Sequence, residues 1–140
     1  MDKTIAVVDG ANVAYAERSD EGAPKVSNMV AMGEALKELE YDFIVIVDAT
    51  LRHEVDEREQ MESLLDEEAW RQGPAGSDAD YFILETAERF DGLVVSNDEF
   101  EAWEEDYAWI RDRRVPFMII RGEVELYDLR PGPAAKGSGS

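Results

Sequence analysis

Three short stretches of the chain are continuously apolar instead of alternating, which is typical of strands buried on both faces of a parallel sheet. They cover residues 4–8, 43–47 and 93–96. A fourth apolar run, 117–120, precedes Arg121-Gly122, a pair that predicts a tight turn. We therefore expect 123–128 to pair back on 117–120 as an edge strand.

Between these strands, apolar residues recur at the spacing of amphipathic helices. The predicted helices span residues 27–39, 54–70, 77–90 and 98–113. Ser27 suits the N-cap of the first helix, and Trp70 is expected to be buried at the end of the second. Strands that alternate with helices predict an α/β fold: a three-layer α/β/α sandwich with a mainly parallel, Rossmann-like central sheet.

Length and composition indicate one domain with an acidic surface. Residues 1–130 are expected to form that domain, and 131–140, rich in Pro, Gly, Ala and Ser, are expected to be a disordered tail. The chain has no cysteine, which excludes disulfides and thiolate metal sites. No apolar stretch is long enough to span a membrane, and the amino terminus lacks a signal-peptide pattern, so we expect a cytoplasmic protein.

The net charge of −19 usually argues against nucleic-acid binding and costs stability through self-repulsion. We favour a halophilic cytosol as its explanation, because the Debye length falls to roughly 3 Å at 1 M salt and the repulsion is then screened. An ordinary acidic bacterial protein is the alternative. The oligomeric state stays open, a homodimer included.

Acidic and amide side chains follow the predicted strands where each strand ends. Asp9 ends the run 5–8, Asn12 lies in the turn after it, and Asp98 follows 93–97. Asp80 lies near the start of the helix between them. Carboxyl ends of parallel strands lie at one edge of a sheet, where ligands bind, so these carboxylates predict a site for Mg²⁺ or Mn²⁺.

Each of these residues also has a purely structural interpretation. Asp9 is equally suited to capping the turn after its strand, and Asn12 and Asn97 to being turn asparagines. Asp80 and Asp98 both fit capping boxes, which begin at Ser77 and Ser96. The structural interpretation needs three separate coincidences, whereas the metal interpretation needs one site.

The motifs resemble those of a known family. Val7-Val8-Asp9-Gly10-Ala11-Asn12-Val13-Ala14 resembles the opening motif of the NYN branch of PIN-like ribonucleases, close to the Zc3h12a-type domain. Asp80-Tyr81-Phe82-Ile83-Leu84 and Asp91-Gly92-Leu93-Val94-Val95-Ser96-Asn97-Asp98 resemble its second and third motifs. The resemblance spans residues 4–128 and implies a PIN-like NYN nuclease domain.

The resemblance also implies an Mg²⁺- or Mn²⁺-dependent endoribonuclease that acts on single-stranded RNA. It places the metal-binding and catalytic carboxylates at Asp9, Asp80 and Asp98, with Asn12 as a polar catalytic helper. Two positions depart from the family pattern, because Ala79 and Ala102 stand where acids are common; the neighbouring acids Asp78 and Glu101 are candidates to replace them.

Further residues near this edge have two interpretations. Asn97 is a candidate for substrate binding or is a turn asparagine. Arg52 is likewise a candidate for substrate binding or is an exposed loop residue, whereas an exposed loop residue is the favoured interpretation of His53. Asp48 ends the second strand, but matches no family motif and receives little weight.

Two other functions stay open. A non-catalytic PIN-like module that binds RNA or protein is favoured modestly by the two alanines. A receiver-like phospho-acceptor domain is disfavoured, because such domains resemble an acidic pair after the first strand and a late lysine. Here one acid follows that strand, and no lysine lies between Lys37 and Lys136.

Overall fold

A parallel five-stranded sheet forms the centre of the fold. The structure is a computed structural model that describes residues 3–74, 78–127 and 129. The strands lie in the order β3-β2-β1-β4-β5, and every neighbouring pair is parallel. They are β1 (Ile5–Asp9), β2 (Asp42–Asp48), β3 (Trp70–Gly73), β4 (Leu93–Val95) and β5 (Arg114–Val115). The mainly parallel sheet predicted from the sequence is confirmed.

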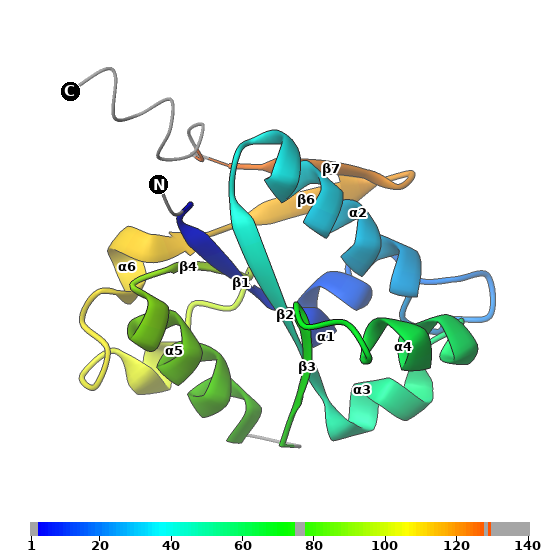
Figure 1. Cartoon of the computed structure of the whole chain (residues 1–140), viewed down its shortest axis with the longest axis horizontal. Helices are drawn as coiled ribbons and strands as arrows, with labels where there is room; N and C mark the ends of the chain where they lie inside the picture. The colour runs from blue at the N-terminus through cyan, green and yellow to red at the C-terminus, as the bar shows by residue number, and fades with distance from the viewer. Residues whose placement is uncertain (1–2, 75–77, 128, 130–140) are drawn as a thin grey trace.

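Helices cover both faces of this sheet, which explains why its central strands are apolar throughout. The helical elements are α1 (Gly10–Ala14), α2 (Val26–Glu38), α3 (Ala49–Glu54), α4 (Arg58–Leu64), α5 (Asp78–Phe90), the 3₁₀ helix η1 (Glu101–Trp103) and α6 (Ile110–Arg113). In Figure 1, α2 and α5 lie on opposite sides of β1 and β2. No helix in the described part of the chain is long and apolar enough to cross a membrane.

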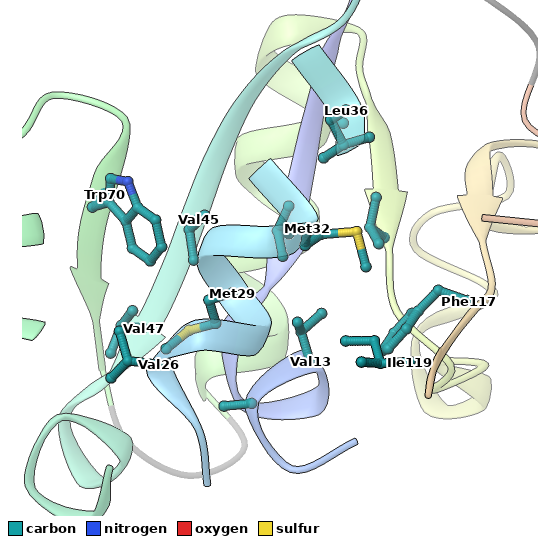
Figure 2. Close-up of a cluster of buried hydrophobic side chains, with 14 of the residues drawn as sticks. Val13, Val26, Met29, Met32, Leu36, Val45, Val47, Trp70, Phe117 and Ile119 are labelled. Carbon is teal, nitrogen blue, oxygen red and sulfur yellow. The ribbon is translucent and has the colours of Figure 1, made fainter. Parts of the chain in front are cut away.

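Successive residues of β1 pack into different cores. Ala6 and Val8 point to the cluster formed with Met29, Met32 and the other side chains of Figure 2. Val7 points to the opposite cluster, with Leu84 of α5. All three β1 residues are fully buried, so the strand is held on both faces and its carboxyl end is fixed in place.

The last two strands form a separate hairpin. Strand β6 (Phe117–Ile120) pairs antiparallel with β7 (Glu123–Leu126), and Gly122 lies in the turn with a φ of 80°. This confirms the predicted turn and the returning strand. The hairpin is not hydrogen-bonded into the five-stranded sheet, and its strand β7 packs on α2.

The predicted helix over 54–70 is wrong. Two short helices, α3 and α4, occupy part of this region, and they are separated at Val55, whose ψ of 155° is extended. Trp70 is buried as expected, but it begins strand β3 and pairs beside Val45 of β2. Within 54–70, α3 contributes only Glu54 and α4 covers Arg58–Leu64; pairing with β2 then makes residues 70–73 a strand.

The predicted helix over 98–113 is also wrong. Phe100 has a left-handed backbone with a φ of 51°, and only η1 and α6 are helical in this segment. The carboxylate of Asp98 accepts a hydrogen bond from the Phe100 main chain at 2.8 Å. This local bond stabilises a turn in place of a helix start, while the Phe100 ring is buried.

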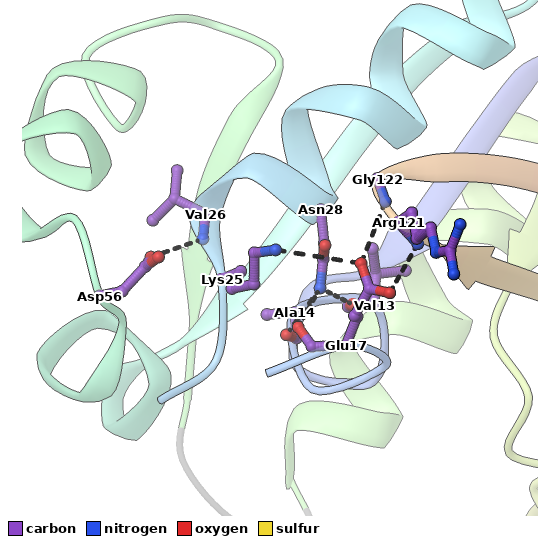
Figure 3. A network of polar contacts seen from close by, with 9 residues as sticks. All are labelled: Val13, Ala14, Glu17, Lys25, Val26, Asn28, Asp56, Arg121 and Gly122. Carbon is purple, nitrogen blue, oxygen red and sulfur yellow. Dashed lines mark hydrogen bonds and ion pairs between the residues drawn. The ribbon is translucent and has the colours of Figure 1, made fainter. Parts of the chain in front are cut away.

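A polar network anchors α1, the helix that follows the first motif (Figure 3). The buried Asn28 amide donates to the carbonyls of Val13, Ala14 and Glu17, at 2.8–3.3 Å. The Glu17 carboxylate accepts hydrogen bonds from the main chain of Arg121 and Gly122 in the hairpin turn. The end of α1 is therefore tied to α2 and to the β6–β7 hairpin.

The predicted cap of α2 at Ser27 is wrong as well. The helix begins at Val26, and the N-cap residue is Lys25, whose side chain makes no capping bond. Asp56 accepts a hydrogen bond from the Val26 main chain at 3.0 Å instead (Figure 3). Ser77 and the predicted tail 131–140 lie outside the described residues.

Candidate active site

An open hollow of about 520 Å³ lies at the carboxyl edge of the parallel sheet. All four residues of the sequence-predicted catalytic set line it. The lining residues are Asp9, Ala11, Asn12, Tyr15, Ala16, Asp48, Ala79, Asp80, Asn97 and Asp98. The hollow thus contains four carboxylates and no cationic side chain among the described residues.

Asp9 is the most deeply placed of these acids. It is the N-cap of α1, with Oδ1 accepting from the Asn12 main chain at 3.3 Å. Its Oδ2 accepts from the Ser96 hydroxyl at 2.9 Å. The side chain is 8% exposed, and burial raises the pKa of Asp9 to about 6, although both hydrogen bonds oppose this. The negative charges of Asp80 and Asp98 raise the pKa further.

The structural and functional interpretations of Asp9 are therefore compatible, because one carboxylate both caps α1 and lines the hollow. Gly10 makes this arrangement possible. A Cβ at Gly10 would lie 2.4 Å from the main-chain oxygen of Ile46 in β2. Only glycine lets α1 start so close to the neighbouring strand.

Two asparagines connect the strand ends. Asn12 Oδ1 accepts a hydrogen bond from the Asn97 main chain at 2.9 Å. The Asn97 side chain donates to the Phe117 carbonyl at 3.0 Å and accepts from the Phe117 N–H at 2.9 Å. Asn97 lines the hollow, but its amide holds β6 through Phe117. No described residue accepts a hydrogen bond from the NH₂ group of Asn12, which also lines the hollow.

Asp98 follows β4 and is exposed on the rim of the hollow. Its N–H donates to the Ser96 hydroxyl at 3.0 Å, and its Oδ1 accepts from Phe100. The capping-box interpretation of Ser96 is wrong, because no α-helix begins here. The Ser96 hydroxyl instead connects the Asp9 carboxylate, to which it donates, with the main-chain N–H of Asp98, from which it accepts.

Asp80 reaches the hollow from the first turn of α5. Burial raises the pKa of Asp80, the charge of Asp98 raises it further, and hydrogen bonding by the Trp103 side chain lowers it. Of the two positions that depart from the family pattern, Ala79 lines the hollow, whereas Ala102 lies in the exposed η1 turn.

Of the two candidate substitute acids, only the side chain of Glu101 can be placed. Glu101 is exposed in η1 and does not line the hollow. Asp78 begins α5, and its side chain lies outside the described part of the structure. The acid that the structure adds is Asp48, the N-cap of α3, whose Oδ1 accepts from the Leu51 main chain at 2.7 Å. The sequence signal that pointed to Asp48 was its position at the end of a predicted strand.

Arg52 and His53 lie outside the lining of the hollow. The Arg52 guanidinium forms a two-fold ion pair with Glu62 and donates to the Gln72 side chain at 2.6 Å. This ion pair raises the pKa of Arg52 and lowers that of Glu62. The structure therefore gives Arg52 a role in joining α3, α4 and β3.

Tyr15 was missed by the sequence interpretation. It lines the hollow at the end of α1, and its hydroxyl donates to Glu54 at 2.9 Å. The Arg18 guanidinium lies 4.9 Å from the centre of the Tyr15 ring. A cationic group is thus held beside the hollow by an aromatic contact, at the side of α1.

The donor set fits a hard divalent cation. The negative charges of Asp80 and Asp98 raise the pKa of Asp9, that of Asp98 also raises the pKa of Asp80, and a cation between the three carboxylates would relieve this repulsion. No three acidic or histidine side chains within 3–74 and 78–127 form a ready-made ligand cluster. The set therefore suits Mg²⁺ held partly through water, since this ion commonly keeps several of its waters.

Comparison with known proteins agrees with this architecture. The family model described as "Zc3h12a-like Ribonuclease NYN domain" matches residues 2–136. A comparison with curated protein sequences gave no match.

Two similar solved structures are both of the nuclear proteinaceous RNase P 2 (PRORP2) from Arabidopsis thaliana, at 23% and 22% identity. Their TM-scores are 0.69 and 0.70, over 90% and 91% of this chain. The chain spans about 30% of the length of those proteins, and the likeness shows the shared fold.

Proposed function

The chain belongs to the Zc3h12a-like ribonuclease NYN family, and we propose that it is an Mg²⁺- or Mn²⁺-dependent endoribonuclease acting on single-stranded RNA. The observation that carries the proposal is the hollow at the carboxyl edge of the sheet. It gathers Asp9, Asp80 and Asp98 with Asn12, and the pKa values of Asp9 and Asp80 are raised there by burial and by the charges of neighbouring acids.

Asp9, Asp80 and Asp98 would hold the cation. When bound, Mg²⁺ or Mn²⁺ supplies an acidified water and positive charge for the scissile phosphate. The chain's own contribution is to fix the carboxylates. The Ser96 hydroxyl donates to the Asp9 carboxylate and accepts from the Asp98 main chain, and burial on both faces of β1 restricts where Asp9 can move.

Asn12 is suited to orienting the substrate. Its Oδ1 is fixed by the Asn97 main chain, so its NH₂ group can donate to a phosphate oxygen without adding negative charge to an acidic hollow. Positioning the phosphate for in-line attack is the main task of such a site, because the chemistry itself needs mostly orientation and charge stabilisation.

A second candidate function is a non-catalytic module that binds RNA. Ala79 favours it, because this residue lines the hollow where family members commonly have an acid. A module of this kind would retain the fold and the hollow without turning over its substrate.

The test is cleavage of labelled single-stranded RNA with Mn²⁺ or Mg²⁺, repeated with EDTA. We expect Asp9→Asn and Asp98→Asn to reduce cleavage by at least about 100-fold. Loss of a residue that only supports a metal ligand costs about 10- to 100-fold in metal affinity or activity, and loss of a ligand should cost at least as much. Glu101→Gln is the matched control, because Glu101 is an exposed acid outside the hollow. Cleavage that persists in EDTA would refute the metal-dependent mechanism, and RNA that binds but stays intact would favour the non-catalytic module.

A further inference from the structure

A row of aromatic side chains extends away from the hollow on the side of Asp80. Neighbouring rings are in contact from Tyr81 to Trp103, Tyr107 and Trp109, with centroid separations of 5.9, 6.3 and 5.8 Å. The rings come from two parts of the chain, and each part carries a carboxylate of the hollow. Tyr81 follows Asp80 on α5, and the other three rings lie in the segment that begins at Asp98.

Tyr107 and Trp109, the half of the row farther from Asp80, have a structural role. Tyr107 is 4% exposed, and its hydroxyl donates to Glu85 at 2.7 Å. The Trp109 indole N–H donates to Glu88 at 3.3 Å, and the Arg113 guanidinium lies 4.1 Å from the ring. Burial and satisfied polar atoms therefore account for Tyr107 and Trp109, which pack the η1–α6 segment against α5.

Tyr81 and Trp103, the half of the row beside Asp80, differ from the other two rings. Tyr81 is 49% exposed although it packs against Trp103. Trp103 is half-buried, and its side chain also hydrogen-bonds Asp80. Tyr81 is thus about half open to solvent, and its ring contacts Trp103, whose side chain also reaches a carboxylate of the hollow.

We propose that Tyr81, supported by Trp103, is the platform on which a base of single-stranded RNA stacks while its phosphate lies in the hollow. This inference rests on the proposed function and names the contact by which the site holds its substrate. The 5.9 Å between the two rings is less than two stacking distances of about 3.4 Å, so a base lies over Tyr81 and does not enter between the rings.

The charge of the surrounding surface favours a base over a phosphate as the occupant. Glu101, Glu104 and Glu105 are exposed beside Trp103, and they repel a phosphate backbone. A base is neutral, and stacking on an aromatic ring contributes to affinity without ion pairing. A protein with a net charge of −19 and no cationic side chain in the described lining of the hollow needs such a contact.

The experiment measures binding separately from cleavage. Fluorescence anisotropy of a short labelled oligoadenylate is recorded with the wild-type protein in EDTA and in Ca²⁺. Tyr81→Ala should weaken binding roughly 5- to 150-fold, the range for loss of one base–aromatic stack. Tyr81→Phe, which keeps the ring, should bind like wild type, and so should Tyr127→Ala, a similarly exposed tyrosine on the β6–β7 hairpin.

Two further readouts separate stacking from a structural effect. An oligomer with abasic sugars throughout should bind the wild type and Tyr81→Ala equally, because it has no base to stack. The slope of affinity against salt should be unchanged by Tyr81→Ala, since no phosphate contact is lost. Trp103→Phe should retain binding, because the supporting ring remains, whereas Trp103→Ala should weaken it.

The outcomes also distinguish this inference from the proposed function. Oligoadenylate binding that depends on Tyr81, without cleavage in Mg²⁺ or Mn²⁺, would support the platform and refute the ribonuclease proposal. Equal binding by wild type and Tyr81→Ala, or no oligoadenylate binding by the wild type in either condition, would overturn the platform whether or not RNA is cleaved.

Discussion

Replacing Asp9 with asparagine should remove activity and at the same time stabilise the protein. Asp9 is 8% exposed, and burial raises its pKa from 3.8 to about 6. The folded protein therefore binds the Asp9 proton more tightly than the unfolded chain does, and unfolding releases it between pH 4 and 6. Stability consequently falls as pH rises through this window, and above it the protein bears the full cost of an ionised, buried carboxylate.

The size of this effect follows from the pKa. The change from 3.8 to about 6 corresponds to about 3 kcal/mol, at 1.36 kcal/mol for each tenfold change in proton affinity. Asparagine carries no charge but cannot accept from both Asn12 and Ser96, which costs about 1 kcal/mol for the weakened hydrogen bond. We expect a net gain of about 2 kcal/mol for Asp9→Asn at pH 7.5, or about 6 °C in melting temperature for a chain of this length.

The assay is thermal and urea unfolding of wild type and Asp9→Asn from pH 4 to pH 8, in EDTA so that no divalent ion contributes. The free energy of unfolding of Asp9→Asn minus that of wild type should increase between pH 4 and 6 and level off above pH 7. Asp48→Asn is the matched control, because it removes another carboxylate from the hollow while leaving an amide at an N-cap. Parallel pH profiles for wild type and Asp9→Asn would refute the assignment of a raised pKa to Asp9.

Four other perturbations test the packing around the site and the acids at its rim. Gly10→Ala should destabilise the fold by about 1–3 kcal/mol in urea unfolding, because the new Cβ would meet the Ile46 main chain and that strand has no room to move. Asn28→Asp should cost about 3 kcal/mol in the same assay, since it turns a carboxylate toward three main-chain carbonyls; Asn28→Ala should cost less. Calorimetric titration with Mn²⁺ should show weaker binding in Asp48→Asn and unchanged binding in Glu101→Gln; the reverse would restore Glu101 as the additional acid. Molar KCl should raise the melting temperature by screening the net charge of −19, and a melting temperature indifferent to salt would contradict the halophilic interpretation.

The parallel sheet and the gathering of the four polar residues could be predicted because both follow from strand order. Continuous apolar runs identify buried parallel strands, and residues that follow such strands share one edge. Asp9 and Asp98 come to the same hollow for this reason alone. The same rule applies to Asp48, which also ends a strand and lines the hollow although it matches no family motif.

The local conformation of the acidic segments could not be predicted in the same way. In residues 54–70 and 98–113, apolar residues at roughly helical spacing are buried, but the chain between them turns at Val55 and Phe100. In the first segment, Trp70 pairs with β2, a contact far away in the sequence, and in the second a local hydrogen bond to Asp98 stabilises the turn at Phe100. The platform at Tyr81 depends on the second of these segments, because only a non-helical path brings Trp103 against α5.

The acidic hollow places a physical limit on how RNA can be held. Four carboxylates line it, and Arg18, which lies against the lining residue Tyr15, is not itself part of the lining. Without a divalent ion the hollow repels a phosphate, so phosphate binding and metal binding must be coupled, each strengthening the other. Simple ion pairing with lysine or arginine would instead weaken steeply with salt. A site that combines a metal-bound phosphate with a stacked base would lose less affinity in salt, which would suit a protein whose net charge of −19 is screened by salt.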